Sequence, residues 1–174
     1  MTYFNSHTEM SIVQFNYASH YNAVQKLVRP WEVEHLITRN VSPWVMARNP
    51  PLPEQVARYL REQFQSKQLS YKSDPPGFDV WYSPAVTLRR RAGDCEDFAI
   101  LGVSMLTAVG ISAEVAVGTY SNGYSSSGHA WVEGRDNHGG FLIEGTTGDI
   151  HRHYRPAEYT LMWSLTPNIG RRAA

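Results

Sequence analysis

The feature that most constrains the fold is a run of apolar residues that begins directly after a cluster of polar ones. Within residues 95–109 the apolar side chains lie nearly all the way around a helix, and Gly110 is suited to cap its C-terminus. A helix that is apolar on most sides has to be buried. We therefore expect residues 95–109 to form the central helix of the fold.

The segments on either side of this helix follow different periodicities. Residues 54–69 place apolar side chains on one helical face, which predicts an amphipathic helix. The serine-rich segment 121–128 has the composition of a mobile connection, and residues 136–140 carry a hairpin turn signal. Around these two turn signals the pattern predicts four strands, at residues 114–117, 129–133, 141–144 and 159–165. Helices followed by an antiparallel sheet predict an α+β fold.

The length of the chain is that of one domain with an extension. Its 174 residues exceed the commonest domain size only slightly. Residues 1–50 are rich in aromatic side chains and are repeatedly broken by proline, so we interpret them as an N-terminal extension that packs on the domain. Residues 51–168 are expected to form the domain itself, and residues 169–174 a flexible tail.

Composition and charge argue against several classes of protein. Apolar residues make up 42% and charged residues 18% of the chain, which is ordinary for a folded soluble protein. The formal net charge is zero, and the basic run at residues 89–91 is followed by acidic residues, so neither nucleic acid nor a membrane surface is an expected partner. The N-terminus does not have the pattern of a signal peptide, and no apolar stretch approaches the ~18–20 residues of a membrane helix. A single cysteine excludes an internal disulfide, and we expect a cytoplasmic protein.

The one cysteine lies at the polar start of the expected central helix. Asp94 is a good N-cap residue, and Asp97 is placed to complete a capping box. Cys95 then falls in the first turn, where unpaired backbone N–H groups favour a thiolate by ~0.3–1 kcal/mol and are able to donate to an oxyanion. The carboxylates of Asp94, Glu96 and Asp97 oppose that thiolate. Ionisation of Cys95 therefore requires an imidazolium partner.

His129 is the best candidate for this partner. It follows a glycine at the start of an expected strand, which places it at the rim of the sheet. Glu144 lies on the next strand across the hairpin, where a carboxylate is able to orient the imidazole as the third member of a triad. Asp136 and Asp149 are alternatives for that third position. The order along the chain is cysteine, histidine, carboxylate.

The other group of residues with metal-binding chemistry is a set of histidines. His151 and His153 have the spacing of one strand face, and His138 and Cys95 are further candidate ligands. No second cysteine pair accompanies them, so a zinc site is not expected. We interpret His151 and His153 as residues of a surface or of a substrate rim.

The motifs around these residues resemble those of the transglutaminase-like cysteine peptidase superfamily. The resemblance rests on DVWYSP at residues 79–84, GDCEDFAI at 93–100, GHAWV at 128–132 and FLIE at 141–144, in that order along the chain. It extends over about residues 54–165, and the first 50 residues have no counterpart in it. It implies a papain-like α+β fold, with a cysteine-bearing buried helix on an antiparallel sheet, and a triad of Cys95, His129 and Glu144. Members of the superfamily usually carry aspartate where this chain has Glu144.

The resemblance also implies further site residues. Family members use the backbone N–H of the cysteine, together with a group from the preceding aromatic segment, as oxyanion donors; here that segment offers Trp81 or Tyr82. Some bacterial relatives bind calcium through acidic residues that flank the cysteine, and Asp94 and Glu96 match those positions. Helix capping is the alternative role for these acidic residues, and no other cofactor is expected.

The expected activity is therefore that of a cysteine hydrolase. It would cleave a peptide or amide bond of a protein or peptide substrate through a thioester on Cys95. The same site resolved by an amine would instead make a transglutaminase or another acyltransferase. A non-catalytic, partner-binding domain on the same fold is a further alternative, which the replacement of aspartate by Glu144 keeps open. The substrate and the oligomeric state are not readable from the sequence.

Overall fold

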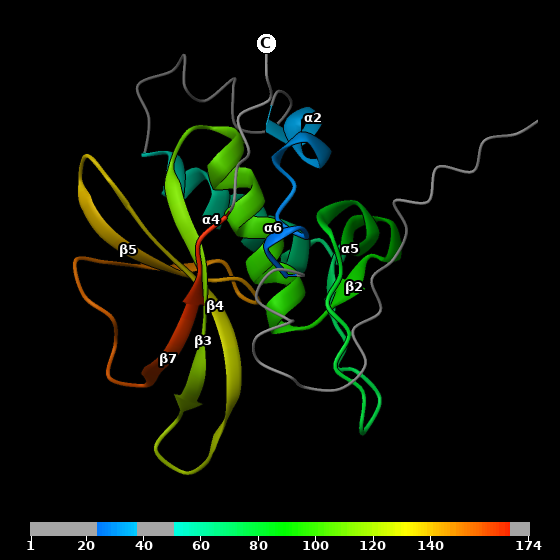
Figure 1. Ribbon diagram of the computed structural model, residues 1–174, viewed down its shortest axis with the longest axis vertical. Helices are drawn as coiled ribbons and strands as arrows, with labels where there is room; N and C mark the ends of the chain where they lie inside the picture. The colour runs from blue at the N-terminus through cyan, green and yellow to red at the C-terminus, as the bar shows by residue number, and fades with distance from the viewer. Residues whose placement is uncertain (1–23, 38–50, 168–174) are drawn as a thin grey trace, which may run out of the picture.

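Helix α6 (Cys95–Ala108) packs against a five-stranded antiparallel sheet in the computed structural model of the protein, which describes residues 24–37 and 51–167 (Figure 1). The side chains from Phe98 to Leu106 are buried, which confirms the central helix predicted from its apolar circumference. The predictions for residues 1–23 and 38–50 and for a tail at 169–174 lie outside the described residues.

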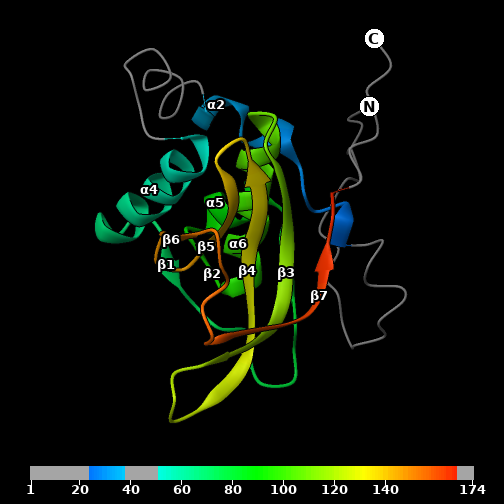
Figure 2. The same cartoon turned by 90° about the vertical axis from the view of Figure 1, so that its left-hand side faces the viewer.

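The sheet is built from strands that follow one another along the chain, except at one edge. Its order is β6-β5-β4-β3-β7, and every neighbouring pair is antiparallel. The last strand, β7, crosses back to pair with β3 on the far side (Figure 2). The strands are β3 (Ser112–Ser121), β4 (Ser126–Asp136), β5 (Gly139–Glu144), β6 (Asp149–Arg152) and β7 (Tyr159–Leu165).

Alternation along the strands divides the sheet into two apolar faces. Val115, Val132 and Ile143 belong to the main core together with the side chains of α6. On the opposite face, Ala116, Trp131 and Leu142 form a smaller buried cluster against which Tyr159 packs. Each large apolar side chain buried in this way contributes roughly 1.5–3 kcal/mol to stability.

The remaining helices cover the edges of the main core. Helix α4 (Leu52–Gln65) packs on α6 and on β5 and β6, and its buried face is the apolar stripe seen in the sequence. Between α4 and α6, a helix that the sequence did not predict, α5 (Pro84–Arg90), is flanked by the short parallel pair β1 (Ser70–Tyr71) and β2 (Ala92–Gly93).

Residues before position 51 also contribute to the core. The turn η1 (Pro30–Glu32) lies against α6 and leads into the short helix α2 (Glu34–Leu36). Four valine and leucine side chains of this segment are buried in the main core: Val24, Leu27, Val28 and Val33. Residues 24–37 are therefore packed onto the domain, while the domain boundary at residue 51 stays a prediction. No helix within the described ranges has the length and apolar character that crossing a bilayer requires.

The serine-rich segment 121–128 is mostly paired strand, whereas its composition predicts a loop along its whole length. Strand β3 continues to Ser121 and β4 starts at Ser126, so the two strands pair up to a tight turn. The carboxamide oxygen of Asn122 accepts hydrogen bonds from the backbone N–H groups of Tyr124 (3.0 Å) and Ser125 (2.9 Å), and Gly123 takes a positive φ of 86°. Backbone pairing does not require apolar side chains, so composition was a poor guide here.

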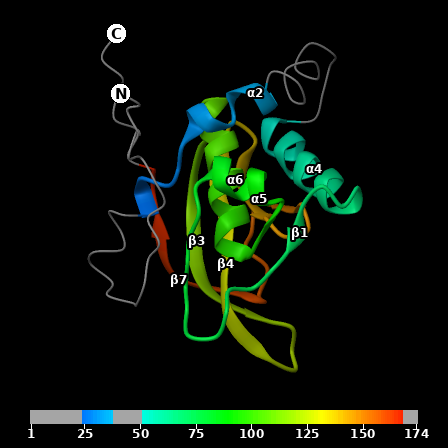
Figure 3. The same ribbon diagram turned by 90° about the vertical axis from the view of Figure 1, so that its right-hand side faces the viewer.

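The long β3–β4 hairpin determines where His129 lies. Strand β5 pairs with β4 only from Val132 to Asp136, so the part of β4 that carries His129 extends past the end of β5. The hairpin projects beyond the rest of the sheet, near the N-terminal end of α6 (Figure 3). This arrangement places a histidine on a strand next to a cysteine at the start of a helix.

Candidate active site

The start of α6 is fixed by the predicted capping box. Asp94 is the N-cap residue, and the side chain of Asp97 accepts a hydrogen bond from the backbone N–H of Asp94 (3.4 Å). Asp97 also accepts from the backbone N–H of Tyr82 (2.8 Å), so it ties the preceding segment to the helix. Burial raises the pKa of Asp97 to about 8. Gly93 leaves room for this carboxylate, because a Cβ there would lie 2.6 Å from Oδ2 of Asp97.

Cys95 is the first residue of α6, and its thiol lies among acidic groups. Its Sγ donates a hydrogen bond to Oε2 of Glu96 (3.1 Å). Burial raises the pKa of the thiol, and the charge and hydrogen bond of Glu96 raise it further, while a backbone hydrogen bond from Ala130 lowers it only in part. On balance the pKa of the thiol lies above its usual value. The thiol needs a basic partner in order to ionise.

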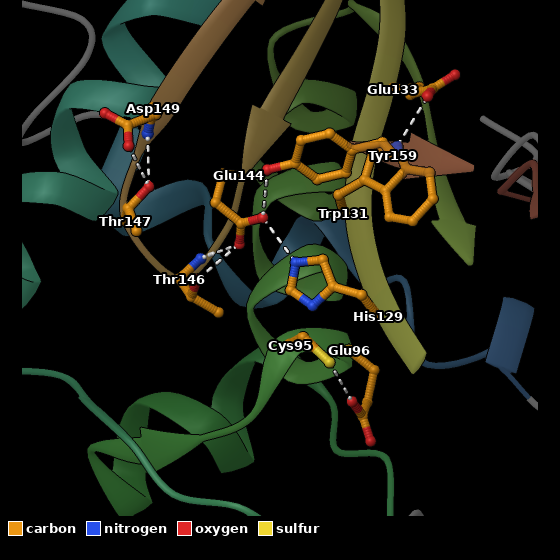
Figure 4. Close-up of polar contacts among 10 residues, drawn as sticks. All are labelled: Cys95, Glu96, His129, Trp131, Glu133, Glu144, Thr146, Thr147, Asp149 and Tyr159. Carbon is orange, nitrogen blue, oxygen red and sulfur yellow. Dashed lines mark hydrogen bonds and ion pairs between the residues drawn. The ribbon is translucent and has the colours of Figure 1, made fainter. Parts of the chain in front are cut away.

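The imidazole of His129 lies between Cys95 and Glu144 (Figure 4). Its Nε2 is 2.6 Å from Oε2 of Glu144, and the other ring nitrogen points towards the start of α6. The indole of Trp131 stacks beside the imidazole, with ring centroids 6.2 Å apart and an interplanar angle of 24°. The structure therefore places Glu144 in contact with His129, and the free nitrogen of His129 faces the end of α6 that carries Cys95.

Glu144 lies at the end of β5 and is 6% exposed. Its Oε1 accepts hydrogen bonds from the backbone N–H (3.0 Å) and the hydroxyl (2.6 Å) of Thr146. Its Oε2 accepts from the hydroxyl of Tyr159 (3.0 Å) as well as from His129. Burial raises the pKa of Glu144, but the hydrogen bonds and charge of His129, together with Thr146, outweigh burial and hold the pKa below its usual value. The carboxylate is therefore ionised at neutral pH.

The two alternative carboxylates have other partners. Asp149 forms an ion pair with Arg61 (3.2 Å) and accepts a hydrogen bond from the hydroxyl of Thr147 (2.7 Å). Asp136 forms an ion pair with Arg152 (2.8 Å) at the opposite end of β4 from the β3–β4 turn. Of the three candidates, only Glu144 contacts His129 within the described part of the chain.

One N–H group of each expected oxyanion donor already has an acceptor. The indole N–H of Trp81 donates to Asp79 (2.6 Å), and the ring stacks on Trp163 with centroids 6.2 Å apart. The backbone N–H of Tyr82 donates to Asp97, and its ring lies 3.9 Å from the guanidinium of Arg90. Assignment of either residue as an oxyanion donor stays a prediction.

Three carboxylates gather beside the cysteine. Asp74, Asp94 and Glu96 each offer an oxygen, and these oxygens lie within 4.8 Å of one another. Burial and the charge of Asp94 raise the pKa of Glu96 to about 9, and burial also raises the pKa of Asp94. Across residues 24–37 and 51–167 this trio is the one group close enough to hold a metal ion, and His138, His151 and His153 form no such group with Cys95.

Sequence reasoning missed three residues of this site: Asp74, Thr146 and Tyr159. Asp74 lies in a proline-rich loop whose path no periodicity predicts. Tyr159 reaches Glu144 because β7 crosses to the far edge of the sheet, where Tyr120 pairs with Tyr159. Thr146 was the easiest of the three to predict from the sequence, because a threonine two residues after a carboxylate commonly forms a turn with it.

Comparison with known proteins identifies the class to which this fold and site belong. The family model of the transglutaminase-like superfamily matches residues 45–143, which is more than half of the chain. The protein belongs to this superfamily. No curated protein sequence gives a significant match.

Solved structures confirm the predicted papain-like, transglutaminase-core fold. LapG of Legionella pneumophila in its calcium-bound form aligns with a TM-score of 0.54 and 18% identity, over 85% of this chain and 73% of LapG. The EGTA-treated form of LapG aligns with a TM-score of 0.53 and 20% identity, over 84% of this chain and 81% of the LapG chain. A candidate cysteine protease from Cytophaga hutchinsonii aligns with a TM-score of 0.53 and 18% identity over 75% of this chain. This chain spans 43% of the length of the Cytophaga protein.

Proposed function

We propose that the protein is a cysteine hydrolase that cleaves a peptide or amide bond in a protein or peptide substrate. The observation that carries the proposal is the imidazole of His129, held by Glu144 at 2.6 Å with its free nitrogen towards Cys95. The structural neighbour from Cytophaga hutchinsonii, described as a candidate cysteine protease, supports the same class of activity.

The reaction follows from the position of each group. His129 takes the proton of Cys95, and the thiolate attacks the carbonyl carbon of the scissile bond. The backbone N–H of Cys95, with Trp81 or Tyr82 as the predicted second donor, stabilises the resulting oxyanion. The protonated His129 gives its proton to the leaving amine, which leaves a thioester on Cys95. A water molecule deprotonated by His129 then attacks the thioester, releasing the carboxylic acid and restoring the thiol.

The contribution of Glu144 to this reaction is orientation and charge. An ionised carboxylate at Nε2 fixes the tautomer in which that nitrogen carries the proton and the other nitrogen is free to act as a base. It also stabilises the imidazolium that forms in each half of the reaction. The low pKa of Glu144 supports this role.

We expect the wild-type protein to form a thioester that water resolves. The test is mass spectrometry of a peptide library incubated with the protein, with and without an added primary amine, and with Cys95→Ala as the control. Products with new carboxyl termini in both conditions support the hydrolase. Products that carry the amine instead identify an acyltransferase. If neither condition gives a product that depends on Cys95, the protein is a non-catalytic, partner-binding domain.

We also propose that Asp74, Asp94 and Glu96 bind calcium. The donor set fits, because Ca²⁺ prefers carboxylate oxygens and three of them converge here. In addition, Oδ1 of Asp94 is buried and has no hydrogen-bond partner among the described residues. A bound divalent cation would neutralise part of the negative charge beside Cys95. The calcium-bound and EGTA-treated forms of LapG support the same choice of ion.

Calcium is expected to raise the melting temperature of the chelator-treated protein by about 5–10 °C when its concentration exceeds the Kd a hundredfold. Asp74→Asn is expected to reduce the affinity for calcium at least about tenfold, because it removes one charged ligand. The asparagine is still able to accept the hydrogen bond that the backbone N–H of Val80 donates, so the loop is expected to keep its structure. Differential scanning calorimetry with Asp149→Asn as the matched control measures both effects. A calcium response that is absent, or that is equal in the wild type and Asp74→Asn, contradicts the site.

A further inference from the structure

Glu144 accepts hydrogen bonds from four donors, and one of them lies on β7, at the other edge of the sheet from β6. Thr146 supplies the two donors at Oε1, and His129 supplies one at Oε2. The fourth donor is the hydroxyl of Tyr159 on strand β7, 3.0 Å from Oε2. We infer that Tyr159 is a positioning residue of the active site, which holds the Glu144 carboxylate in the orientation that His129 requires. This inference rests on the proposed function of Cys95 and His129.

A glutamate in the third position needs such a restraint more than an aspartate does. Its side chain has one more rotatable bond, so its carboxylate has more orientations to lose when it is ordered. Thr146 restrains Oε1 only, which leaves the carboxylate free to swing about that oxygen. Tyr159 restrains Oε2, the same oxygen that accepts the hydrogen bond from His129. The two restraints together fix both oxygens.

Tyr159 is itself held rigidly enough for this role. Its backbone pairs with Tyr120 of β3, and its ring contacts those of Tyr120 (centroids 5.0 Å apart) and Trp131 (5.2 Å, edge to face). The ring also lies 6.2 Å from the imidazole of His129. Burial and the charge of Glu144 raise the pKa of Tyr159, so the phenol stays protonated and remains a donor. Figure 4 shows its hydroxyl directed at Glu144, on the side away from Thr146.

The experiment compares Tyr159→Phe with Tyr120→Phe in the full chain. Both changes remove a hydroxyl from the same aromatic cluster, but the Tyr120 hydroxyl has no hydrogen-bond partner within the described ranges, so it is the matched control. The first readout is the rate at which iodoacetamide labels Cys95 at neutral pH. The second is the NMR signal of the Nε2-bound proton of His129 in protein labelled with ¹⁵N-histidine, assigned by its loss in His129→Ala.

We expect Tyr159→Phe to slow labelling by about tenfold, because it removes a hydrogen bond to a charged acceptor. We also expect it to shift or broaden the His129 proton signal, and Tyr120→Phe to change neither readout. In a Glu144→Gln background, Tyr159→Phe is expected to have less than about a twofold further effect, because its contribution passes through the carboxylate.

The outcomes separate this inference from the proposed function. If labelling depends on His129 but Tyr159→Phe behaves like Tyr120→Phe, the positioning role is wrong and the proposed function stands. An equal loss in the wild-type and Glu144→Gln backgrounds means that Tyr159 acts only on the fold, which also overturns the inference. If labelling does not depend on His129, the proposed function fails, and the His129 proton signal alone decides whether Tyr159 positions Glu144.

Discussion

Replacing His129 by alanine is expected to lower turnover by roughly 10⁴-fold or more while the fold is retained. The reason is the setting of the nucleophile. Burial and Glu96 raise the pKa of Cys95, so the thiol does not ionise at neutral pH without a base beside it. The side chain of His129 is partly buried at the rim of the sheet, and its loss leaves most of the core in place. Turnover of any substrate that the wild type cleaves, with circular dichroism as the check on folding, measures this effect.

His138 provides the matched control for this change. It lies exposed in the turn between β4 and β5, remote from Cys95, and its backbone N–H bonds to Asp136. His138→Ala is expected to leave turnover within about twofold of the wild type, as for most surface substitutions. Equal turnover in His129→Ala and the wild type would exclude His129 as the base.

Replacing Glu144 by glutamine is expected to lower turnover by roughly 10²–10⁴-fold. Glutamine keeps the size of the side chain, but it removes the charge that stabilises the imidazolium and allows the wrong tautomer of His129. The amide oxygen is still able to accept from Thr146, so the turn after β5 is expected to persist. Steady-state kinetics combined with a thermal melt separates the loss of charge from any loss of stability.

The comparison variants for Glu144 are the other two carboxylates that the sequence left open. Asp149→Asn removes an ion pair with Arg61, and Asp136→Asn one with Arg152, but neither residue contacts His129. Neither change is expected to alter turnover appreciably. The exposed pair of Asp149 contributes no more than about 1 kcal/mol to stability. The Asp136 side chain is 3% exposed, so Asp136→Asn is expected to destabilise the protein more. Unchanged turnover in Glu144→Gln together with a loss in Asp149→Asn would move the third role to Asp149.

The elements that sequence predicted best are those fixed by local chemistry. The apolar circumference of residues 95–109 led directly to the buried helix α6, and Asp94 with Asp97 led to its capping box. The proximity of His129 and Glu144 followed from one tight hairpin between two adjacent strands. In each case the information lay within a few tens of residues.

The features that the sequence did not predict depend on long-range pairing, on an irregular loop, or on an element too short to show a pattern. Tyr159 contacts Glu144 only because β7 pairs with β3 across the sheet, and no periodicity encodes that crossover. Asp74 reaches Asp94 and Glu96 through a loop with no regular structure. The helix at Pro84–Arg90 was missed because seven residues are too few for an apolar period to stand out.

The position of Cys95 gives the site two opposing influences. The helix start offers N–H groups to an oxyanion, whereas Glu96 and Asp94, two members of the acidic trio, oppose a thiolate. We propose that His129, together with calcium at the trio, overcomes this opposition. Both contributions act on the same thiol, so its reactivity reports on the whole site.

The most direct test of the central claim is therefore the rate at which iodoacetamide labels Cys95 at pH 6, in the presence of calcium, in the wild type and in His129→Ala. We predict that the wild type is labelled much faster than a free cysteine in solution, because an imidazolium partner keeps the thiol ionised below its ordinary pKa. We also predict that His129→Ala loses this enhancement. Equal labelling rates in the two proteins would contradict the assignment of Cys95 and His129 as nucleophile and base.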